Sequence, residues 1–445
     1  MNQPLPISRV VNLIPEATQR LWSTQAADAR QSLLAGDMQA VLTLDGSFAL
    51  VAQDGERVVM ARSLDRPMRY FLAKATEGPV LIVADRIDAI AAELDRRGWS
   101  AQFHPSYTRM VPAHHVTTLR LVGCPDPNPV HQRFFDPPRG TLGTDLDVIG
   151  RAYVQALCSE LHQWVAAHEE GAPIGVPFSG GVDSGVVLLC LNQVLLDRGQ
   201  SPARLKAFTL SVDGGGEDAQ QAREFLRLTH LEMLGEVIDA QSSELDPLRA
   251  VAVIEDYKPL DVECAAVNLA LLAGIRSRYP DWRLLVDGDG GDENLKDYPI
   301  EENHELTIRS VVNNRMLYQE GWGVETIKHS LTYSGGFSRA CVRGYACAAQ
   351  HGFDTFSPHT RPSVIAVAEG IPFAALSEGS HDRLYALKGD IVSRGVREIL
   401  GVEMPVFAKR RFQHGSVAVD DRTRLFPTDE SLYRNHFETL HASVG

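Results

Sequence analysis

The chain has 445 residues, with 43 Lys and Arg against 57 Asp and Glu. Its formal net charge of −14 argues against a nucleic acid or an anionic membrane as partner, because both attract basic surfaces. The length predicts two or three domains, and no stretch approaches the roughly 18 uninterrupted apolar residues of a membrane-spanning helix. The cysteines are scattered and form no Cys-x-x-Cys pair. This distribution predicts reduced thiols, a cytoplasmic location and no zinc site.

The first 140 residues predict a small α+β unit. Helices are expected over 17–34 and 87–97, and alternating apolar and polar residues predict strands over 40–44, 47–51, 58–61, 80–83 and 115–121. Asp45-Gly46 and Asp54-Gly55 are natural hairpin turns between the first three strands. Residues 123–143 hold five prolines and are expected to form a linker or a long surface connection.

From residue 141 onward, helices and strands are expected to alternate. The helices are predicted over 145–168, 186–196, 219–228 and 263–278, and the strands over 174–178, 205–212, 234–238 and 283–286. This alternation predicts an α/β domain with a mainly parallel sheet that is covered on both faces. In such sheets ligands bind beyond the carboxyl ends of the strands.

A glycine-rich segment, Ser-Gly-Gly-Val-Asp-Ser at 179–184, follows a predicted strand and opens a helix. Gly180 and Gly181 allow a ligand to approach the backbone, and the first helix amides form an anion site that Ser179 and Ser184 complete with hydroxyl groups. Asp183 fits this site if Mg²⁺ bridges its carboxylate to phosphates. The segment lacks the Gly-Lys-Ser/Thr of a Walker A loop and resembles the pyrophosphate loop of ATP pyrophosphatases, which cleave ATP to AMP and pyrophosphate.

A second segment, 286–298, carries four acids within seven residues: Asp287, Asp289, Asp292 and Glu293. It resembles the Ser-Gly-Glu-Gly-x-Asp-Glu segment of asparagine synthetases. The resemblance implies a Rossmann-like PP-loop domain over 141–445 that uses ATP and Mg²⁺. It assigns Mg²⁺ to Asp183 and Asp292. It assigns ATP and pyrophosphate contacts to Phe178, Ser179, Gly180, Gly181, Val182, Asp183, Ser184, Asp287 and Gly288.

Further stretches resemble the same family. Val212 matches the position whose main chain holds adenine, and Glu255, within Ile-Glu-Asp-Tyr where the family has Ile-Glu-Thr-Tyr-Asp, matches the proposed general base for the attacking amine. Lys388 matches the lysine that contacts pyrophosphate and the transition state. The basic run at 409–411 could bind phosphate or a carboxylate substrate, or could be a solvated surface run.

Residues 1–140 resemble a degenerate glutamine amidotransferase (Ntn-glutaminase-like) domain, as in the stretch Leu-Asp-Gly-Ser-Phe-Ala at 44–49. The family begins Met-Cys-Gly, whereas this chain begins Met-Asn-Gln and has no cysteine before Cys124. Without a thiol nucleophile the domain is expected to release no ammonia from glutamine. β-Lactam synthetases and lasso-peptide macrolactam synthetases have the same altered domain.

Two charges differ from the family pattern, since Lys258 replaces an aspartate and Glu263 an arginine. Lys258 could hold a substrate carboxylate, and Glu263 an amine or a guanidinium.

The resemblance as a whole implies an AMP-forming ligase that adenylates a carboxylate of a small molecule or peptide for attack by an amine. Such a ligase is expected in natural-product or modified amino-acid biosynthesis, with a homodimer as an open possibility. Ammonia-dependent amidation, a tRNA-modifying PP-loop enzyme and an inactive scaffold remain the alternatives.

Overall fold

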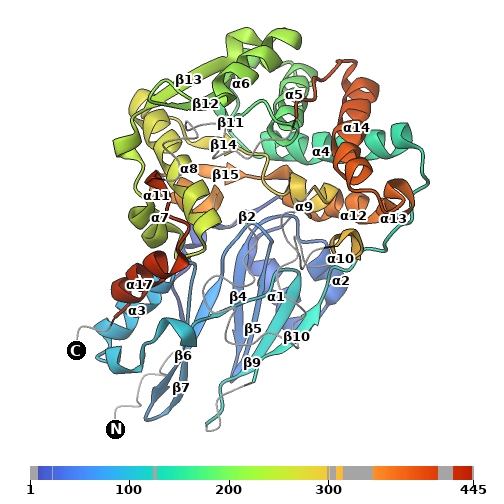
Figure 1. Cartoon of the computed structure of the whole chain (residues 1–445). Coiled ribbons are helices and arrows are strands. Elements are labelled where there is room, and N and C mark those ends of the chain that lie inside the picture. The colour runs from blue at the N-terminus through green and yellow to red at the C-terminus, as the bar shows by residue number, and fades with distance from the viewer. Residues whose placement is uncertain are drawn as a thin grey trace. The chain divides into compact units, whose positions relative to one another are not determined.

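A computed structural model describes residues 9–22, 24–123, 128–297, 300, 307–313, 344–408 and 424–442. The chain divides into two compact units (Figure 1). Unit 1 comprises Met1–Asp136, Gln319–Cys341 and Arg434–Gly445, and unit 2 comprises Pro137–Tyr318 and Val342–Tyr433. The basic run at 409–411, Tyr298 and Cys124 lie outside the described residues.

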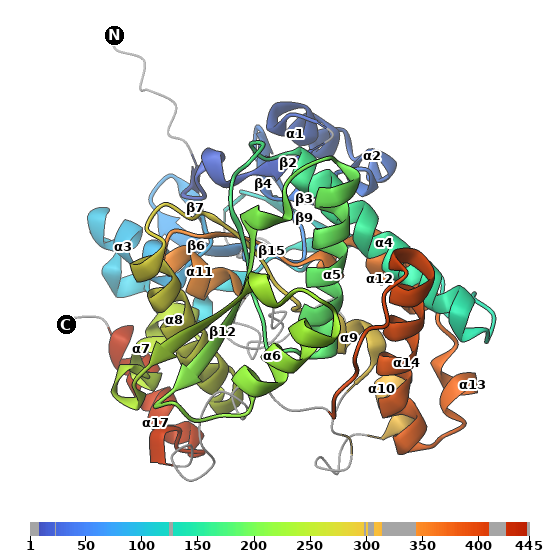
Figure 2. The same cartoon turned by 90° about the horizontal axis from the view of Figure 1, so that it is seen from above.

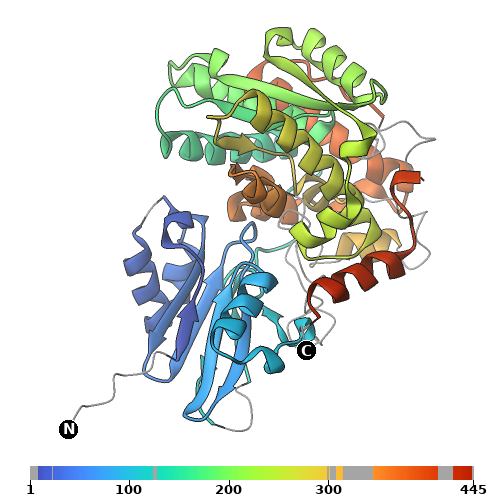
Figure 3. The same cartoon turned by 90° about the vertical axis from the view of Figure 1, so that its left-hand side faces the viewer.

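Unit 1 contains two four-stranded sheets, with strand orders β1-β7-β6-β8 and β10-β9-β5-β4. Their strands are β1 (Val10–Asn12), β4 (Ala49–Asp54), β5 (Arg57–Arg62), β6 (Arg69–Ala75), β7 (Gly78–Ala84), β8 (Arg109–Met110), β9 (His115–Arg120) and β10 (Val130–Arg133), and the short strands β2 (Arg20–Leu21) and β3 (Gly46–Ser47) pair separately. Helices α1 (Ala26–Ala35) and α2 (Met38–Leu42) pack on β4 and β5, and α3 (Ile87–Arg96) packs on β6 and β7. Figure 3 shows the dark-blue and light-blue helices on opposite sides of the strands.

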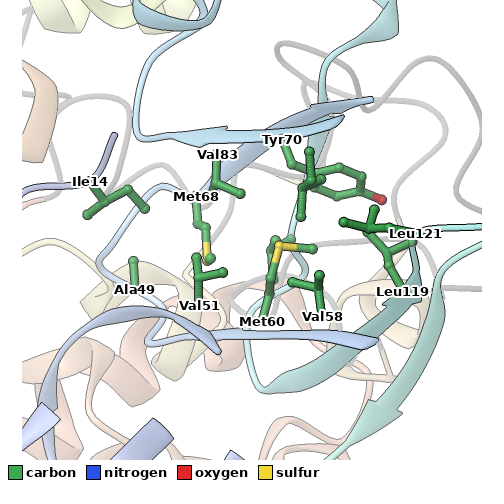
Figure 4. Packing of buried hydrophobic residues seen from close by; sticks show 12 residues of the cluster. Ile14, Ala49, Val51, Val58, Met60, Met68, Tyr70, Val83, Leu119 and Leu121 are labelled. Carbon is green, nitrogen blue, oxygen red and sulfur yellow. The ribbon is translucent and has the colours of Figure 1, made fainter. Parts of the chain in front are cut away.

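The core of unit 1 lies between its two sheets. Val58 and Met60 from β5 and Leu119 from β9 belong to the same buried cluster as Tyr70 from β6 and Val83 from β7. Figure 4 shows these side chains pointing toward one another from the two sheets. Alternate residues of each strand supply this core, as expected for strands with one face buried against a second sheet.

Several predictions for unit 1 are wrong in detail. Residues 40–44 are not a strand, because the Asp37 carboxylate accepts hydrogen bonds from the amides of Gln39 and Ala40, both at 3.0 Å, and so caps the helix α2. The helix predicted over 17–34 begins only at Ala26. The predicted linker contains β10, which pairs with β9, and strand β6 was not predicted.

Unit 2 is built on a five-stranded parallel sheet of order β13-β12-β11-β14-β15, which confirms the predicted α/β fold. The strands are β11 (Ile174–Pro177), β12 (Leu205–Val212), β13 (Gly235–Ala240), β14 (Leu284–Val286) and β15 (Asp354–Phe356). The helices are α4 (Leu146–Ala166), α5 (Val182–Asp197), α6 (Asp218–Leu228), α7 (Pro247–Ile254), α8 (Pro259–Arg278), α9 (Gly291–Leu295), α10 (Ile308–Asn313), α11 (Ala346–Gln350), α12 (Pro362–Gly370), α13 (Phe373–Ser377) and α14 (His381–Leu400). The last described helix, α17 (Glu430–Leu440), crosses the boundary between the units in sequence.

Helices cover both faces of this sheet. Leu226 of α6 lies against Gly235 of β13, whereas Gly274 of α8 lies against Ile238 of the same strand. Residues three apart on a strand point to opposite faces, so α6 and α8 cover opposite faces, as Figure 2 shows with β12 between them. A Cβ on Gly274 would lie 2.2 Å from Ile238 Cγ2, so only glycine permits this close packing.

Helix α14 packs along α4 through a pair of glycines. A Cβ on Gly395 would lie 2.1 Å from the carbonyl oxygen of Gly150, and a Cβ on Gly150 would lie 2.4 Å from the carbonyl oxygen of Ile391. The two backbones are therefore in contact at this crossing. The crossing matters because α14 also carries Lys388, two turns before Gly395.

No helix in the described part of the chain combines the length and apolarity needed to cross a bilayer.

Candidate active site

The topology of the unit 2 sheet marks the place where a ligand site is expected. From β11 the chain moves outward through β12 and β13, and it then returns to the other side of β11 as β14. The loops that follow β11 and β14 therefore leave the sheet at its switch point, at the carboxyl ends of adjacent strands. These loops are the two motifs that the sequence singled out.

The first loop joins β11 to α5 and contains residues 178–181. Phe178 is buried, its amide donates to the Phe208 carbonyl at 2.8 Å, and its ring packs edge-on against Phe225. Gly180 has a φ of +74°, and a Cβ there would lie 3.0 Å from the backbone of Ala222. Phe178 therefore anchors the loop, and glycine at 180 allows it to turn directly against α6.

The start of α5 has the features of an anion site. The amide of Gly181, the N-cap, lies 3.3 Å from Ser179 Oγ, and Val182 and Asp183 form the first turn. Ser184 is buried, with its hydroxyl 3.5 Å from the Gly181 carbonyl. The first amides of a helix have no partner within the helix and lie at the positive end of its dipole. The assignment of phosphate contacts to these residues stays a prediction.

The second loop follows β14 and lies directly against the first. A Cβ on Gly288 would lie 2.8 Å from the Ser184 amide nitrogen, and a Cβ on Gly291 would lie 2.1 Å from Asp183 Oδ1. The carboxylate of Asp287 is buried and accepts hydrogen bonds from the Ser357 hydroxyl and from the Asp289 amide. The glycines thus allow the two acidic loops to touch.

Lys388 joins the acids that follow the two loops, Asp183 in the first turn of α5 and Asp292 in the first turn of α9. Its ammonium nitrogen lies 2.6 Å from Asp183 Oδ2, contacts Asp292 Oδ1, and lies 3.4 Å from Asp297 Oδ2. Lys388 is 5% exposed. Burial lowers its pKa, but the carboxylates of Asp183, Asp292 and Asp297 outweigh burial and hold the pKa of Lys388 well above its ordinary value. Lys388 is therefore a cation that bridges residues 205 and 96 positions away in sequence.

The position of the Lys388 ammonium tests whether Mg²⁺ fits the predicted site. A cation already lies between Asp183 and Asp292, and their side chains keep 24% and 40% exposure. Mg²⁺ commonly takes one or two carboxylates, with water and phosphate oxygens completing its shell. The two residues therefore fit Mg²⁺ held together with phosphates, and no larger group of His, Cys, Asp or Glu suited to a metal occurs in the described ranges.

A buried chain of polar side chains begins at Asn294, within the second acidic segment, and His359 of the same chain lies against Gly290 of that segment. Asn294 Nδ2 donates to Tyr153 Oη at 3.2 Å, and Tyr153 Oη lies 2.8 Å from His359 Nδ1. Burial and then the Lys388 charge lower the pKa of His359 to about 4, against the opposing effect of the Asp183 main chain. The lowered pKa favours a neutral His359 ring at pH 7, and its Nδ1 shares a hydrogen bond with the Tyr153 hydroxyl.

Other predicted residues lie outside the ion cluster. Val212 ends β12, its side chain is buried and its carbonyl accepts from the Gly215 amide at 2.8 Å. Glu255 ends α7 with a φ of +51° and is buried. Lys258 is the N-cap of α8, and Glu263 follows on the same helix, where burial and the Glu263 charge raise the pKa of Tyr433 to about 12.

The sequence did not assign Asp297, His359 or the Asn294–Tyr153 pair. Asp297 lies within the acidic segment, and its position after four other acids was the one signal for it. His359 and Tyr153 carry no local pattern, because their contact joins residues 206 positions apart. The three residues of the ion cluster that the sequence did assign come together in the structure: Asp183, Asp292 and Lys388.

Comparisons with known proteins address the same region. Residues 157–332 match the family model described as asparagine synthase. One solved structure, the U34-tRNA thiolase NcsA from Methanococcus maripaludis with its 4Fe-4S cluster, is 13% identical, and the match covers 66% of this chain and 81% of that chain at a TM-score of 0.24. No match was found among curated proteins.

The family match includes both acidic loops and Glu255, and it confirms the resemblance found in the sequence. Lys388 lies beyond the matched segment and reaches the loops from α14. Members of this family are ATP-dependent ligases. Residues 157–332 of this chain are therefore similar to the asparagine synthase family.

Proposed function

We propose that this chain is an AMP-forming, ATP-dependent ligase that joins a carboxylate to an amine. The observation that carries the proposal is the contact of Lys388 with Asp183 and Asp292, which gathers a cation and two carboxylates at the switch point of the sheet. This arrangement supports binding of a polyphosphate, because the helix start and Lys388 supply positive charge. Mg²⁺ held by Asp183 and Asp292 would neutralise charge on the phosphates.

The proposed reaction has two steps. An oxygen of the substrate carboxylate attacks the α-phosphorus of ATP, the bond to the bridging oxygen breaks, and pyrophosphate leaves while Lys388 balances its charge. The amine nitrogen then attacks the acyl carbon of the acyl-adenylate and AMP leaves. Glu255 is the candidate that accepts the amine proton. Lys258 and Glu263 are the candidates for holding charged groups of the substrates.

Residues 1–140 are proposed to be a glutamine amidotransferase-like domain that has lost its nucleophile. The absence of a cysteine before Cys124 supports this proposal. The amine is then expected to come from a substrate, free or in the same molecule, rather than from glutamine. Ammonia itself is the alternative nucleophile.

The proposal is tested by measuring pyrophosphate and AMP release with a panel of carboxylates, each with and without amines or ammonium. Asp183→Asn is expected to lower pyrophosphate release at least about 100-fold, because it removes a charge that acts on the phosphates. Asp197→Asn, at the exposed far end of α5, is the matched control and should retain full activity. Release of ADP and phosphate, or equal activity of Asp183→Asn, would contradict the mechanism.

A further inference from the structure

The connection between α7 and α8 lies at the same edge of the sheet as the two loops. β14 is parallel to its neighbours, and α8 leads into the start of β14. The end of α8 is therefore at the amino edge of the sheet, and its start is at the carboxyl edge. Residues 255–261 thus lie at the edge where ligands of parallel sheets bind.

Asp256, in this connection, is buried with half of its carboxylate unused. It is 1% exposed, and its Oδ1 accepts hydrogen bonds from the amides of Tyr257 at 2.6 Å and Lys258 at 3.0 Å. Its Oδ2 is buried and accepts no hydrogen bond from any described residue, so the Lys258 ammonium does not bond to it either. A buried carboxylate oxygen without a partner is costly to the fold.

Asp261, in the first turn of α8, is the second such group. It is 7% exposed, and its Oδ1 also has no hydrogen-bond partner among the described residues. The start of α8 favours one negative charge there, but Asp256 lies close enough for the two charges to repel. Burial and then this repulsion raise the pKa of Asp256 to about 7, while Lys258 opposes the rise. Each of these two buried acids therefore keeps a carboxylate oxygen that accepts no hydrogen bond, and their charges repel.

The chemistry of this pair points to an organic cation. Both unused atoms are acceptors, so their complement is a positively charged group with several N–H donors, as in an ammonium or a guanidinium. Asp256 also departs from the asparagine synthetase pattern, which has threonine at this position.

We infer that Asp256 and Asp261 form a binding site for an ammonium or guanidinium group of the substrate. Each carboxylate supplies one buried oxygen to the N–H donors of the cation, directly after the candidate base Glu255. The inference deepens the proposed function, and it rests on that function because only a ligase would use the bound cation as part of its substrate. It narrows the substrates to those that carry a positively charged nitrogen group.

The test measures thermal unfolding in chloride salts of propylammonium, methylguanidinium and potassium at equal ionic strength. The wild-type protein should be stabilised by an organic cation beyond the effect of potassium, because binding to the native state raises its stability. Asp256→Asn and Asp261→Asn should each weaken this apparent affinity about tenfold or more, since each removes a charged acceptor. Asp281→Asn, an exposed aspartate beyond the other end of α8, is the matched control.

A larger effect of propylammonium supports a substrate amine, and a larger effect of methylguanidinium supports an arginine-like group. Equal shifts with potassium, or unchanged shifts in both variants, would overturn the inference. If one variant does not fold, the other variant and the cation selectivity of the wild type still decide whether the two carboxylates bind the cation. Cation binding is measured without ATP, so its result does not depend on the proposed reaction. If the wild-type protein binds the cation but releases no pyrophosphate with any carboxylate, the proposed function is rejected and the cation site is not.

Discussion

At the scale of single residues, the Lys388 charge is expected to act on the carboxylates before the nucleotide binds and on the phosphates afterwards. In the structure its ammonium lies against Asp183 and Asp292, the position proposed for Mg²⁺. A metal ion there would compete with the lysine, which could then turn its charge toward the phosphates. Lys388 would thus protect the acidic loops from repulsion before the nucleotide binds.

Replacing Lys388 by methionine should reveal this competition. The variant leaves the cluster of Asp183, Asp292 and Asp297 without its cation, so the melting temperature should fall in the absence of metal. Added Mg²⁺ should raise the melting temperature of Lys388→Met more than that of the wild type, while pyrophosphate release stays at least about 100-fold lower. An equal response of both proteins to Mg²⁺, compared with NaCl of the same ionic strength, would count against the shared position.

Asp256 predicts a specific pH dependence of stability. Its pKa in the folded protein is raised to about 7, above the roughly 4 expected in the unfolded chain. The group therefore contributes stability below about pH 4 that is lost as the pH rises through about 7. Asp256→Asn removes this loss, so the free energy of unfolding of the variant should gain on that of the wild type between these pH values.

Urea denaturation of wild type, Asp256→Asn and the control Asp281→Asn across this range measures the difference. The asparagine can still accept the Tyr257 and Lys258 amides, so the comparison isolates the charge. Parallel pH profiles for wild type and Asp256→Asn would show that the buried carboxylate is satisfied by another group.

At the scale of elements, the crossing of α4 and α14 determines where Lys388 stands. The two helices touch through their backbones at Gly150 and Gly395. No side chain lies between them that could change its rotamer to make room for an added group. Any added atom at this point must displace a whole helix. The site therefore depends on a packing contact two turns away from its lysine.

Gly395→Ala should destabilise the protein by about 1–3 kcal/mol, because the new methyl group overlaps the Gly150 carbonyl. Pyrophosphate release should also fall, since α14 can relieve the overlap only by moving Lys388. Ser393→Ala, on the same helix, is the control. A stable Gly395→Ala protein with full activity would show that the helices separate without disturbing the site.

The sequence predicted the catalytic elements better than the front ones, for physical reasons. Strand β12 begins and ends at the predicted residues 205 and 212, and every residue of it except Lys206 is buried, as expected for a strand that is covered on both faces. Residues 40–44 are equally apolar but lie after Asp37, whose local capping bonds favour helix. The ion cluster was predicted by family motifs. Its third acid, Asp297, and its supporting His359 depend on contacts between segments distant in sequence, which no local pattern records.

At the scale of the whole molecule, the two units are expected to divide the chemistry unequally. Unit 2 contains both acidic loops and Lys388, and unit 1 contains a packed core between two sheets. Unit 1 thus has a buried core of its own, while residues 1–123 contain no thiol.

Purified protein is accordingly expected to form no detectable glutamate from glutamine, with or without ATP and a carboxylate substrate, because no thiol nucleophile is available in that region. An amine or ammonium salt should support amide formation where glutamine does not. Glutamate release that follows the protein through successive purification steps would contradict the loss of glutaminase activity.

The pairing of α4 with α14 has a consequence for the synthesis of the protein. α4 is the first helix of unit 2 to leave the ribosome, and α14 emerges more than two hundred residues later. During that interval the surface of α4 that packs on α14 stays uncovered, and the chain carries first Asp183 and later Asp292 without their lysine. The nascent chain is therefore exposed to aggregation and to chaperones until α14 is made, and the cluster of Lys388 with Asp183 and Asp292 forms only after that helix has emerged.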